Sequence, residues 1–418
     1  MTINIFGRTD TTQADPSGAD ARDGRSTRSL SGSLSGTNLA RAGDYNLRTV
    51  LQAVRLSPNT TRVEIAEQTG LTAPTIANIT GRLTELGLVK VTGRKQGARG
   101  QPALQLMVEP DGAFGIGLNI DRDHLTLVTL DLAGAVRSRV TREIAFALPA
   151  DVVAFVRAEL DGAIAAGGVD RNRVLGVGVA LPDELGRIEL PGRPEGHGIW
   201  ASTDVAALLG RTMPWPIHCD NDAASAALGE AEYGTGFANP SFFYLLISAG
   251  LGGGVVIDRS YHRGATARSG EIGLMPDPSA VPGATIQDTV SVSALLSRLA
   301  AGGHAVASVD TLGDLQGEAL AVVDRWLADA VRSLTAPLIA INCLVDPDAV
   351  LIGGRLPIAL ILRLAEALTA ALAAIDLPSH AQIMPAVMAQ DAPAIGAAIL
   401  PFLDHMLPSD SILIQAGR

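Results

Sequence analysis

Aromatic residues and cysteines are scarce in this 418-residue chain. Phe, Trp and Tyr together make up 4% of the residues, and Cys219 and Cys343 are its two cysteines. Two cysteines so far apart exclude the disulfide framework of a small secreted domain, and we expect two buried thiols in a reducing compartment. They also exclude a structural zinc site, which needs four nitrogen or sulfur ligands grouped together.

Long apolar runs are missing as well. No stretch supplies the roughly 18 consecutive apolar residues that a membrane-spanning helix needs. The first residues lack the short apolar segment of a secretory signal peptide. The sequence therefore predicts a soluble, cytoplasmic protein without a membrane partner.

What is present is the composition of a folded α/β protein. Hydrophobic residues make up 47% of the chain and glycine contributes 45 residues, which excludes disorder over most of the chain. A single hydrophobic core stops growing near roughly 250 to 300 residues, so a chain of this length predicts two or three domains.

Charge is unevenly distributed along the chain. The net charge is −11, yet residues 41–106 hold nine Lys and Arg against four Asp and Glu and carry +5, which leaves −16 on residues 107–418. An acidic body repels a polyphosphate, so the basic segment is the predicted nucleic-acid footprint. Residues 1–40 lack apolar periodicity and predict a disordered tail, with a DNA-binding arm as the alternative.

Three helical patterns follow in quick succession. Gly70 is placed to end the second helix, Thr72 to cap the third, and Pro74 to fit in its first turn. Two short helices, a turn with glycine and a longer helix predict a helix-turn-helix. The apolar positions that define the three helices are Leu47, Val50, Leu51, Val54, Val63, Ile65, Ala66, Ile76, Ile79, Leu83 and Leu86.

Short β-like runs come next, at 88–91 and 104–108, joined by a basic, glycine-rich segment. They predict the hairpin, or wing, of a winged helix. Polar and cationic side chains of the third helix can read base edges, and the wing can neutralise phosphates. The alternative is a helical docking domain whose cations only solvate one face. The residues predicted to bind DNA are Thr72, Ala73, Thr75, Asn78, Arg82, Arg94, Lys95 and Arg99.

From Phe114 onward, β-like apolar runs alternate with Ala-rich helical stretches. This alternation predicts an α/β body. Two similar strand-rich openings, near Gly117 and near Phe243, predict two lobes with a cleft between them. A long helix extends from Leu320 toward Pro337, which is expected to kink it.

A strand, a glycine-rich turn and a second strand occupy residues 247–255, and Gly270-Glu271-Ile272-Gly273 follows. Glycines let backbone N–H groups approach a ligand, although a tight hairpin turn alone explains this run equally well. With the Asn221-Asp222 pair, the Ile352-Gly353-Gly354 turn and the helix at 394–398, the chain resembles the ROK family. That family groups sugar-responsive repressors with sugar kinases.

The resemblance implies an α/β body of the actin-like ATPase (ribonuclease H-like) fold, preceded by an N-terminal winged helix-turn-helix. The domains expected on this basis are a tail (1–40), the winged helix (41–109), a first lobe (110–235, completed by 386–418) and a second lobe (236–385).

The resemblance also implies roles for cleft residues. Asn221 would hydrogen-bond sugar hydroxyls, and Asp222 aligns with the general base of the kinases. Glu271 would contact the sugar ring, and Gln287 stands in place of a further sugar-binding Glu. Carboxylate and amide groups together satisfy the donors and acceptors of a polyol. Alternatively, Asp222 serves only as the N-cap of the helix at 223–230.

The chain departs from the kinases of the family at the first phosphate loop. Their Asp-x-Gly-Gly-Thr is replaced by Asn119-Ile120-Asp121-Arg122-Asp123. Two carboxylates are expected where an anion would sit, at a cost that the single Arg122 does not offset. Leu274 also replaces the His of the kinase-type Gly-Glu-x-Gly-His segment. We therefore expect no ATP cofactor, no metal, no kinase activity and an altered sugar specificity.

These patterns together predict a sugar-responsive transcriptional regulator, in the first instance a repressor of carbohydrate uptake or catabolism genes. Its expected partners are double-stranded operator DNA, a monosaccharide or sugar derivative, and further copies of the chain as a homodimer or homotetramer. Closure of the lobes on the sugar would change operator affinity. The alternatives are a sugar kinase with a fused DNA-binding domain, and a regulator controlled by a protein partner with a vestigial sugar site.

Overall fold

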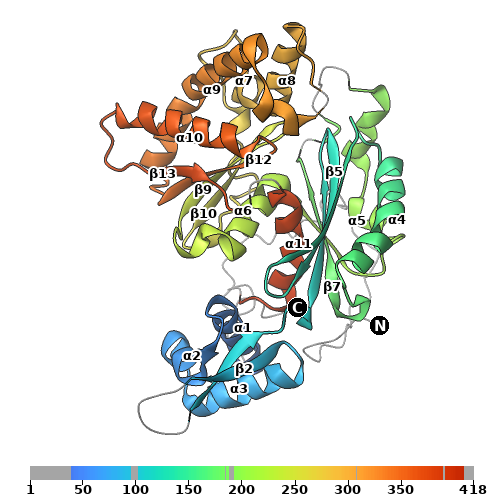
Figure 1. Cartoon of the computed structure of the whole chain (residues 1–418), viewed down its shortest axis with the longest axis vertical. Helices are drawn as coiled ribbons and strands as arrows, with labels where there is room; N and C mark the ends of the chain where they lie inside the picture. Colours follow the sequence, from blue (N-terminus) through green and yellow to red (C-terminus); the bar gives the residue numbers. More distant parts are fainter. Residues whose placement is uncertain are drawn as a thin grey trace.

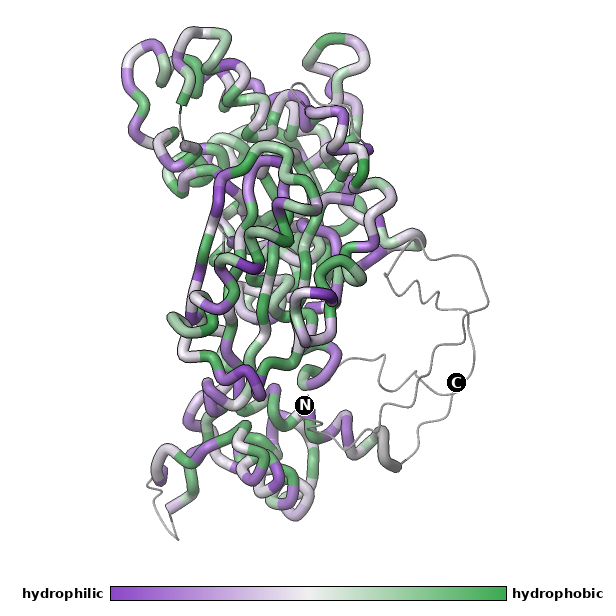
Figure 2. Tube along the Cα trace, turned by 90° about the vertical axis from the view of Figure 1, so that its right-hand side faces the viewer, coloured by the Kyte–Doolittle hydropathy of each residue, from purple (hydrophilic) through white to green (hydrophobic). Residues whose placement is uncertain are grey.

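The computed structural model describes residues 39–95, 102–183, 185–187, 193–306, 308–388 and 391–408. Most of the predicted tail, and the tip of the predicted wing with Arg99, lie outside these residues. The winged helix lies at one end of the molecule and the two lobes stand above it (Figures 1 and 2). The predicted order, a winged helix before a two-lobed α/β body, is confirmed, while the exact domain boundaries stay a prediction.

The winged helix forms where the apolar spacing predicts it. Gly70 ends the second helix in the left-handed conformation, with a φ of 70°. Thr72 is the N-cap residue of the third helix, as predicted, but its hydroxyl bonds that of Thr75 at 2.9 Å and no backbone N–H of the helix. The elements are α1 (Leu39–Leu56), β1 (Thr60–Thr61), α2 (Arg62–Thr69), α3 (Ala73–Glu85), β2 (Val89–Lys95) and β3 (Ala103–Val108), with the strand order β1-β3-β2.

The first lobe is built on a five-stranded sheet of order β6-β5-β4-β7-β8. Successive side chains of a strand point to opposite faces, so Leu127 packs in the core under α4 and Val128 in the core under α11. The elements are β4 (Phe114–Ile120), β5 (His124–Asp131), β6 (Val136–Glu143), α4 (Pro149–Ala166), β7 (Val174–Leu181), α5 (Val205–Gly210), β8 (Ile217–Asn221) and α11 (Ala392–His405). Helix α6 (Asp222–Tyr233) follows β8 and lies between α11 and strands β9 and β10 of the second lobe.

Helix α11 lies directly on this sheet because glycines line the strands beneath it. A Cβ atom added at Gly178 would lie 1.7 Å from the carbonyl oxygen of Ala397, and one at Gly117 would lie 1.9 Å from that of Ala394. Any side chain at these two positions would push the helix away from the strands.

The second lobe carries the other five-stranded sheet, of order β11-β10-β9-β12-β13. Its helices pack in a core around the fully buried Trp326. The elements are β9 (Phe242–Ile247), β10 (Leu251–Ile257), β11 (Ser260–Tyr261), α7 (Ile286–Val290), α8 (Val292–Ala301), α9 (Gly317–Leu344), β12 (Ala349–Gly354), α10 (Ile358–Ala373) and β13 (Gln382–Pro385). Short 3-10 turns lie at Pro110–Gly112, Arg171–Arg173, Glu195–Ser202, Thr235–Phe237, Ile272–Leu274 and Val309–Asp314.

Helix α9 is, among the described residues, long and apolar enough to cross a membrane. Its side chains Val323, Trp326 and Leu334 are instead fully buried in the second-lobe core. On another side of the helix, Asp329 pairs with Arg298 of α8 at 2.6 Å. These contacts are those of a core helix.

The prediction of two buried thiols is wrong for one cysteine. Cys219 on β8 is half-buried, but Cys343 is exposed near the end of α9. The next residue, Leu344, is 84% exposed. One side of the last turn of α9 therefore faces solvent while Ile341 on the other side stays in the core, which apolar neighbours in the sequence did not reveal.

Candidate functional site

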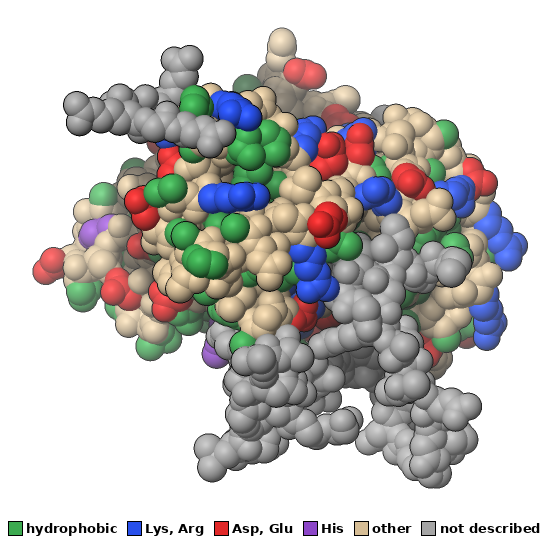
Figure 3. All heavy atoms as spheres, turned by 90° about the horizontal axis from the view of Figure 1, so that it is seen from below, with side chains coloured by type: hydrophobic (Ala, Val, Ile, Leu, Met, Phe, Trp, Pro, Cys, Tyr) green, Lys and Arg blue, Asp and Glu red, His purple; other side chains and the backbone are tan. Residues whose placement is uncertain are grey.

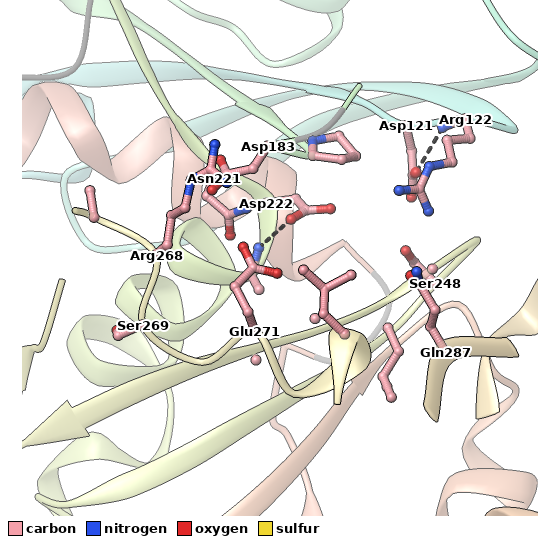
Figure 4. A pocket seen from close by; sticks show the side chains of 18 of the residues that line it. Asp121, Arg122, Asp183, Asn221, Asp222, Ser248, Arg268, Ser269, Glu271 and Gln287 are labelled. Atoms are coloured by element: carbon pink, nitrogen blue, oxygen red, sulfur yellow. Dashed lines mark hydrogen bonds between the residues drawn. The ribbon is translucent and has the colours of Figure 1, made fainter. Parts of the chain in front are cut away.

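A cleft that is partly open to solvent is lined by residues of both lobes. The ends of β4 and β7 and the start of α6 contribute from one side, and the β9–β10 turn, the loop after β11 and α7 from the other. All four residues predicted to bind a sugar line it, namely Asn221, Asp222, Glu271 and Gln287 (Figure 4). The structure brings the set together, and sugar binding itself stays a prediction.

The start of α6 presents Asn221 and Asp222 to the cleft. The carboxamide oxygen of Asn221 accepts the N–H of Ala224 at 3.0 Å, so Asn221 is the N-cap of α6. The alternative interpretation of Asp222 as the N-cap is therefore wrong. Asp222 is the first helical residue, and its Oδ1 accepts the N–H of Ala223 at 2.8 Å. Capping by Asn221 leaves the second carboxyl oxygen of Asp222 to face the cleft.

The carboxyl group of Asp222 titrates near neutral pH. Burial and the charge of Asp121 raise its pKa from 3.8 to about 7, against the opposing effects of the Ala223 N–H and of Arg122. A carboxyl group with this pKa can donate a hydrogen bond to a ligand when protonated and accept one when ionised.

Glu271 reaches the cleft because Gly270 lies against β10. Gly270 has a φ of 92°, and a Cβ atom there would lie 2.3 Å from the carbonyl oxygen of Gly253, so the position requires glycine. The carboxylate of Glu271 lies beside Asp222 in Figure 4. Leu274 also lines the cleft, with 45% of its apolar side chain exposed.

Arg122 extends across the cleft from the first lobe to the β9–β10 turn. A Cβ atom added at Gly250 would lie 2.4 Å from Nη1 of Arg122, so the guanidinium packs directly on this glycine. Figure 4 shows the Arg122 side chain pointing toward Ser248 and Gln287. The guanidinium therefore fills the part of the cleft nearest the glycine-rich turn.

The two carboxylates beside Arg122 point in different directions. Asp121 is buried, lines the cleft and accepts the backbone N–H of Arg122 at 2.7 Å. Asp123 instead turns to Nδ1 of His124 at 2.6 Å and to Nη1 of Arg355 at 2.8 Å. The expectation that both carboxylates occupy the anion position is therefore wrong for Asp123, which an arginine from the other lobe holds aside.

Asp121, Asp123 and His124 form a cluster whose ligand atoms lie within 4.8 Å of one another, close enough for a metal ion. The ring of His124 is already bonded on both sides, by Asp123 and by Asn119 at 3.2 Å. Burial opposes charge on both groups, but the hydrogen bond between them lowers the pKa of Asp123 and raises that of His124. We assign no metal here and describe the cluster as an ion-pair network that reaches Arg355.

Replacing Arg355 with glutamine is expected to loosen the contact between the lobes. Arg355 follows β12 of the second lobe and pairs with Asp123 and Glu143 of the first. Because Glu143 is half exposed, the loss of unfolding free energy should be about 1 kcal/mol. Small-angle X-ray scattering should show a larger radius of gyration. Arg363→Gln, which breaks the exposed pair with Asp324 inside the second lobe, is the control, and equal radii for the two variants would contradict the prediction.

Helix α3 presents most of the predicted DNA-reading side chains on its outer face. Its exposed members are Thr72, Ala73, Asn78 and Arg82. Ile76 and Leu83 are buried on the opposite face, as the apolar spacing predicts. Thr75 is half-buried and hydrogen-bonded to Thr72, so it is the least accessible of the predicted set.

The wing strand β2 runs to Lys95, beyond the predicted 88–91, so Arg94 and Lys95 lie on a strand and not in the turn. Both are exposed. Nζ of Lys95 lies 2.6 Å from Glu64, and this hydrogen bond, with those from Thr61, lowers the pKa of Glu64 to about 2. Lys95 must leave Glu64 to bind a phosphate. Figure 3 views this end from below and shows Lys and Arg spaced over the face.

Two family models match the chain over these same regions. One, described as the ROK family, matches residues 122–402, which include every residue that lines the cleft except Asp121. The chain belongs to the ROK family. The other, described as winged helix-turn-helix DNA-binding, matches residues 44–90, which include α2 and α3. This ROK protein thus joins a body of the actin-like kinase fold to a DNA-binding module.

The relatives of this ROK protein include one uncharacterized protein and several that are regulators by name. It is 27% identical to the uncharacterized protein y4fQ of Sinorhizobium fredii over 370 residues, which cover 85% of this chain and 90% of the relative. It is 22% identical to the xylose repressor of Bacillus subtilis over 231 residues, 55% of this chain and 60% of the repressor. It is 26% identical to the DNA-binding transcriptional dual regulator NagC of Escherichia coli over 224 residues, 51% and 52% of the two chains.

Solved structures support the fold of this ROK protein. A ROK family transcriptional regulator, a homologue of the Escherichia coli Mlc protein, superposes with a TM-score of 0.64 at 20% identity, covering 89% of this chain and 99% of that one. A ROK family glucokinase from Streptomyces griseus, in complex with glucose and AMPPNP, gives 0.53 at 22% identity, covering 69% and 99%. The fold is therefore shared by regulators and kinases of the family.

Some side chains of the ROK cleft were not found from the sequence. Asp183, Ser248, Tyr261 and Arg268 also line it. Asp183 follows β7, at the carboxyl edge of a parallel strand where α/β proteins bind ligands, and Arg268 lies inside the stretch that carries the family resemblance. Both signals were present in the sequence. The position of Arg122 had no such signal, because it depends on how closely the two lobes approach.

Part of the basic segment of this ROK protein faces its own body. Arg48 and Arg55 of α1 are buried, with 3% and 9% exposed, and they bond α11 and α6. The charge of +5 counted over 41–106 therefore overstates the positive charge that is accessible to DNA. Charge counted along a sequence does not distinguish a solvated cation from a buried, paired one.

Proposed function

We propose that this ROK protein is a cytoplasmic, sugar-responsive, DNA-binding repressor of genes for carbohydrate uptake or catabolism. The observation that carries the proposal is that one chain holds both a cleft lined by carboxylates and two carboxamides and a helix α3 with an exposed outer face. Such groups suit the hydroxyls of a sugar. The names of two relatives, a xylose repressor and a transcriptional dual regulator, support the same function. We expect paired copies on paired half-sites.

The cleft favours a sugar over a nucleotide. A triphosphate needs open backbone N–H groups, and a carboxylate beside it repels it unless a metal ion lies between them. Here the guanidinium of Arg122 packs on the glycine-rich turn, and the buried Asp121 lies beside it. Asn119, which replaces an Asp of the family's kinases, is buried against His124. These features support binding of an effector without its phosphorylation.

A sugar kinase fused to a DNA-binding domain is the second candidate. A glucokinase shares the fold, and the pKa of about 7 at Asp222 suits a general base. Release of ADP from ATP is measured with D-xylose, D-glucose and N-acetyl-D-mannosamine. We expect no sugar-dependent release. Turnover that Asp222→Asn abolishes would establish the kinase instead.

Glu271→Gln is expected to weaken binding of the sugar effector. Removing the charge of a hydrogen-bond acceptor costs about 1.5 to 3 kcal/mol, or roughly a 10- to 150-fold increase in Kd. Operator duplexes are first selected from a randomised library with the full-length protein. The same three sugars are then tested for a shift in Tm and for a change in affinity for the selected duplex.

Glu159→Gln is the matched control for this experiment. Glu159 lies on α4 and pairs with Arg142, outside the residues that line the cleft. The Glu159→Gln variant should show the same shift in Tm and the same change in operator affinity with sugar as the wild type. A Glu271→Gln variant with the response of the wild type would show that the effector does not bind in this cleft.

Sugar affinity should rise with pH through neutrality. The Asp222 carboxyl, with a pKa of about 7, is largely protonated below that pH and ionised above it, and an ionised carboxylate accepts stronger hydrogen bonds. Titration calorimetry between about pH 6 and pH 8 should show tighter binding at the higher pH and release of a proton on binding. Asp222→Asn should bind with no such pH dependence, and a dependence retained by that variant would assign it to another group.

The same carboxyl should lower the stability of the unliganded protein as pH rises from 3.8 to about 7. In that window the folded state binds this proton more strongly than the unfolded state, so each step upward in pH favours unfolding. The difference in unfolding free energy between the wild type and Asp222→Asn should follow this trend in urea titrations. A difference that does not vary with pH would contradict the raised pKa.

A further inference from the structure

Helix α1 of the winged helix lies across the C-terminal ends of α6 and α11, the two helices at the centre of the body (Figure 1). Arg55 donates to the carbonyl oxygen of Glu232 at 2.9 Å and to its carboxylate at 3.0 Å. Its guanidinium also stacks on the ring of Tyr233, 4.1 Å from the centroid. Arg48 donates to the carbonyl oxygen of Asp404 at 2.9 Å. We call Arg48 and Arg55, together with these contacts, the arginine joint.

The arginine joint uses the electrostatics of helix ends. The last four carbonyl groups of a helix have no partner within it, and the end carries a partial negative charge that a cation stabilises. Arg48 and Arg55 are two turns apart, so they project from one face of α1. Each therefore caps one of the two central helices, and both are buried while doing so.

Helix α6 connects this joint to the cleft. Its first residue is Asp222 and its N-cap is Asn221, which both line the cleft, and Glu232 and Tyr233 are its last two residues. Twelve residues at 1.5 Å per residue span roughly 18 Å. Any displacement of the α6 N-terminus by a ligand therefore reaches Arg55 through a single rigid element.

Helices α6 and α11 are packed as one unit because they touch backbone to backbone. A Cβ atom added at Gly396 of α11 would lie 1.6 Å from the carbonyl oxygen of Ser225, and one at Gly229 would lie 3.2 Å from Cα of Gly396. Glu230 of α6 is buried and accepts the N–H of Val387 at 3.0 Å, which ties the pair to the loop after β13. A change in the relative position of the lobes therefore reaches both caps.

We propose that the arginine joint transmits the state of the cleft to the DNA-reading helix. This inference rests on the proposed function and names how its site is regulated. When a ligand shifts α6 and α11, the two caps shift α1 and with it α3. Without Arg48 and Arg55, α1 stays attached by its apolar face, since Leu47 and Leu51 share one core with Phe402 and Met406. A ligand in the cleft then no longer shifts α3.

The test uses the full-length variant with Arg48→Gln and Arg55→Gln together. A matched control carries Arg142→Gln and Arg363→Gln, which break two ion pairs of the body far from α1 in sequence. Hydrogen exchange is first measured without ligand. The joint variant should exchange several-fold faster than the wild type over α2 and α3, and equally over residues 248–274 of the cleft. If the joint variant exchanges over α2 and α3 at the same rate as the wild type, the proposal is wrong.

The second measurement adds D-xylose, D-glucose or N-acetyl-D-mannosamine and the selected operator duplex. A sugar that slows exchange over 248–274 in the wild type should change operator affinity by about 5- to 150-fold. In the joint variant the sugar should still protect the cleft, with operator affinity changing less than about twofold. A wild-type response in that variant overturns the inference.

The two failures are distinguishable. If no sugar protects the wild-type cleft while the joint variant still loosens α2 and α3, the joint stands as a structural coupling and the sugar effector of the proposed function is wrong. If a sugar protects the cleft and the control responds like the joint variant, loss of charge alone explains the result, and the joint is wrong.

Discussion

Gly178→Ala should strongly destabilise this ROK protein. The new methyl group would lie 1.7 Å from the carbonyl oxygen of Ala397 in α11. Both partners belong to regular backbone, so neither can rotate away, and α11 must move off the sheet. Overpacking of this kind costs about 1 to 3 kcal/mol and sometimes more, and a backbone contact belongs at the upper end. Urea unfolding followed by circular dichroism should show a lower midpoint.

Gly162→Ala is the control for that substitution. Gly162 is an exposed glycine inside α4, with nothing within 4 Å of an added Cβ atom. Alanine there should raise the unfolding free energy by about 0.5 to 1 kcal/mol, because glycine loses more backbone entropy in a helix. Two variants of equal stability would mean that α11 is not seated on the strands at Gly178.

Arg82→Ala should reduce affinity for the selected operator by about 1 to 3 kcal/mol, which is roughly 5- to 150-fold, and relax its sequence preference. Arg82 is exposed on the outer face of α3, where a guanidinium can bond a base edge. Fluorescence anisotropy with selected and unselected duplexes should show that the loss is confined to the selected sequence.

Arg94→Ala serves as the comparison on the wing. Arg94 is exposed on β2, and a phosphate contact carries no sequence information. Its removal should weaken both duplexes alike and reduce the dependence of log Kd on log salt concentration by about one. If Arg82→Ala shows this uniform loss too, α3 is not the recognition helix.

The winged helix could be predicted from the sequence because its signals are local. Gly70 ends α2 with a positive φ, and Ile76 and Leu83 face inward at helical spacing. The strand β2 exceeded its predicted length because Arg94 and Lys95 pair with β3 residues about ten positions away. Propensity within a short window does not report such pairing.

The candidate cleft could be predicted in part. The family resemblance supplied Asn221, Asp222, Glu271 and Gln287, and all line one cavity. The resemblance could not tell which of two adjacent polar residues caps α6. That choice depends on backbone geometry at a single residue, which placed Asn221 at the cap.

By itself, the sequence determined the order of the parts, four residues of the cleft and the outer face of α3, because hydrophobic period, glycine position and motif spacing act between near neighbours in the chain. Tertiary structure alone decided that Arg122 fills the cleft, that Asp123 turns to Arg355, and that Arg48 and Arg55 cap body helices. The physical reason is that a charge is placed by whichever partner packing brings within bonding distance, and these partners lie more than 120 residues away along the chain.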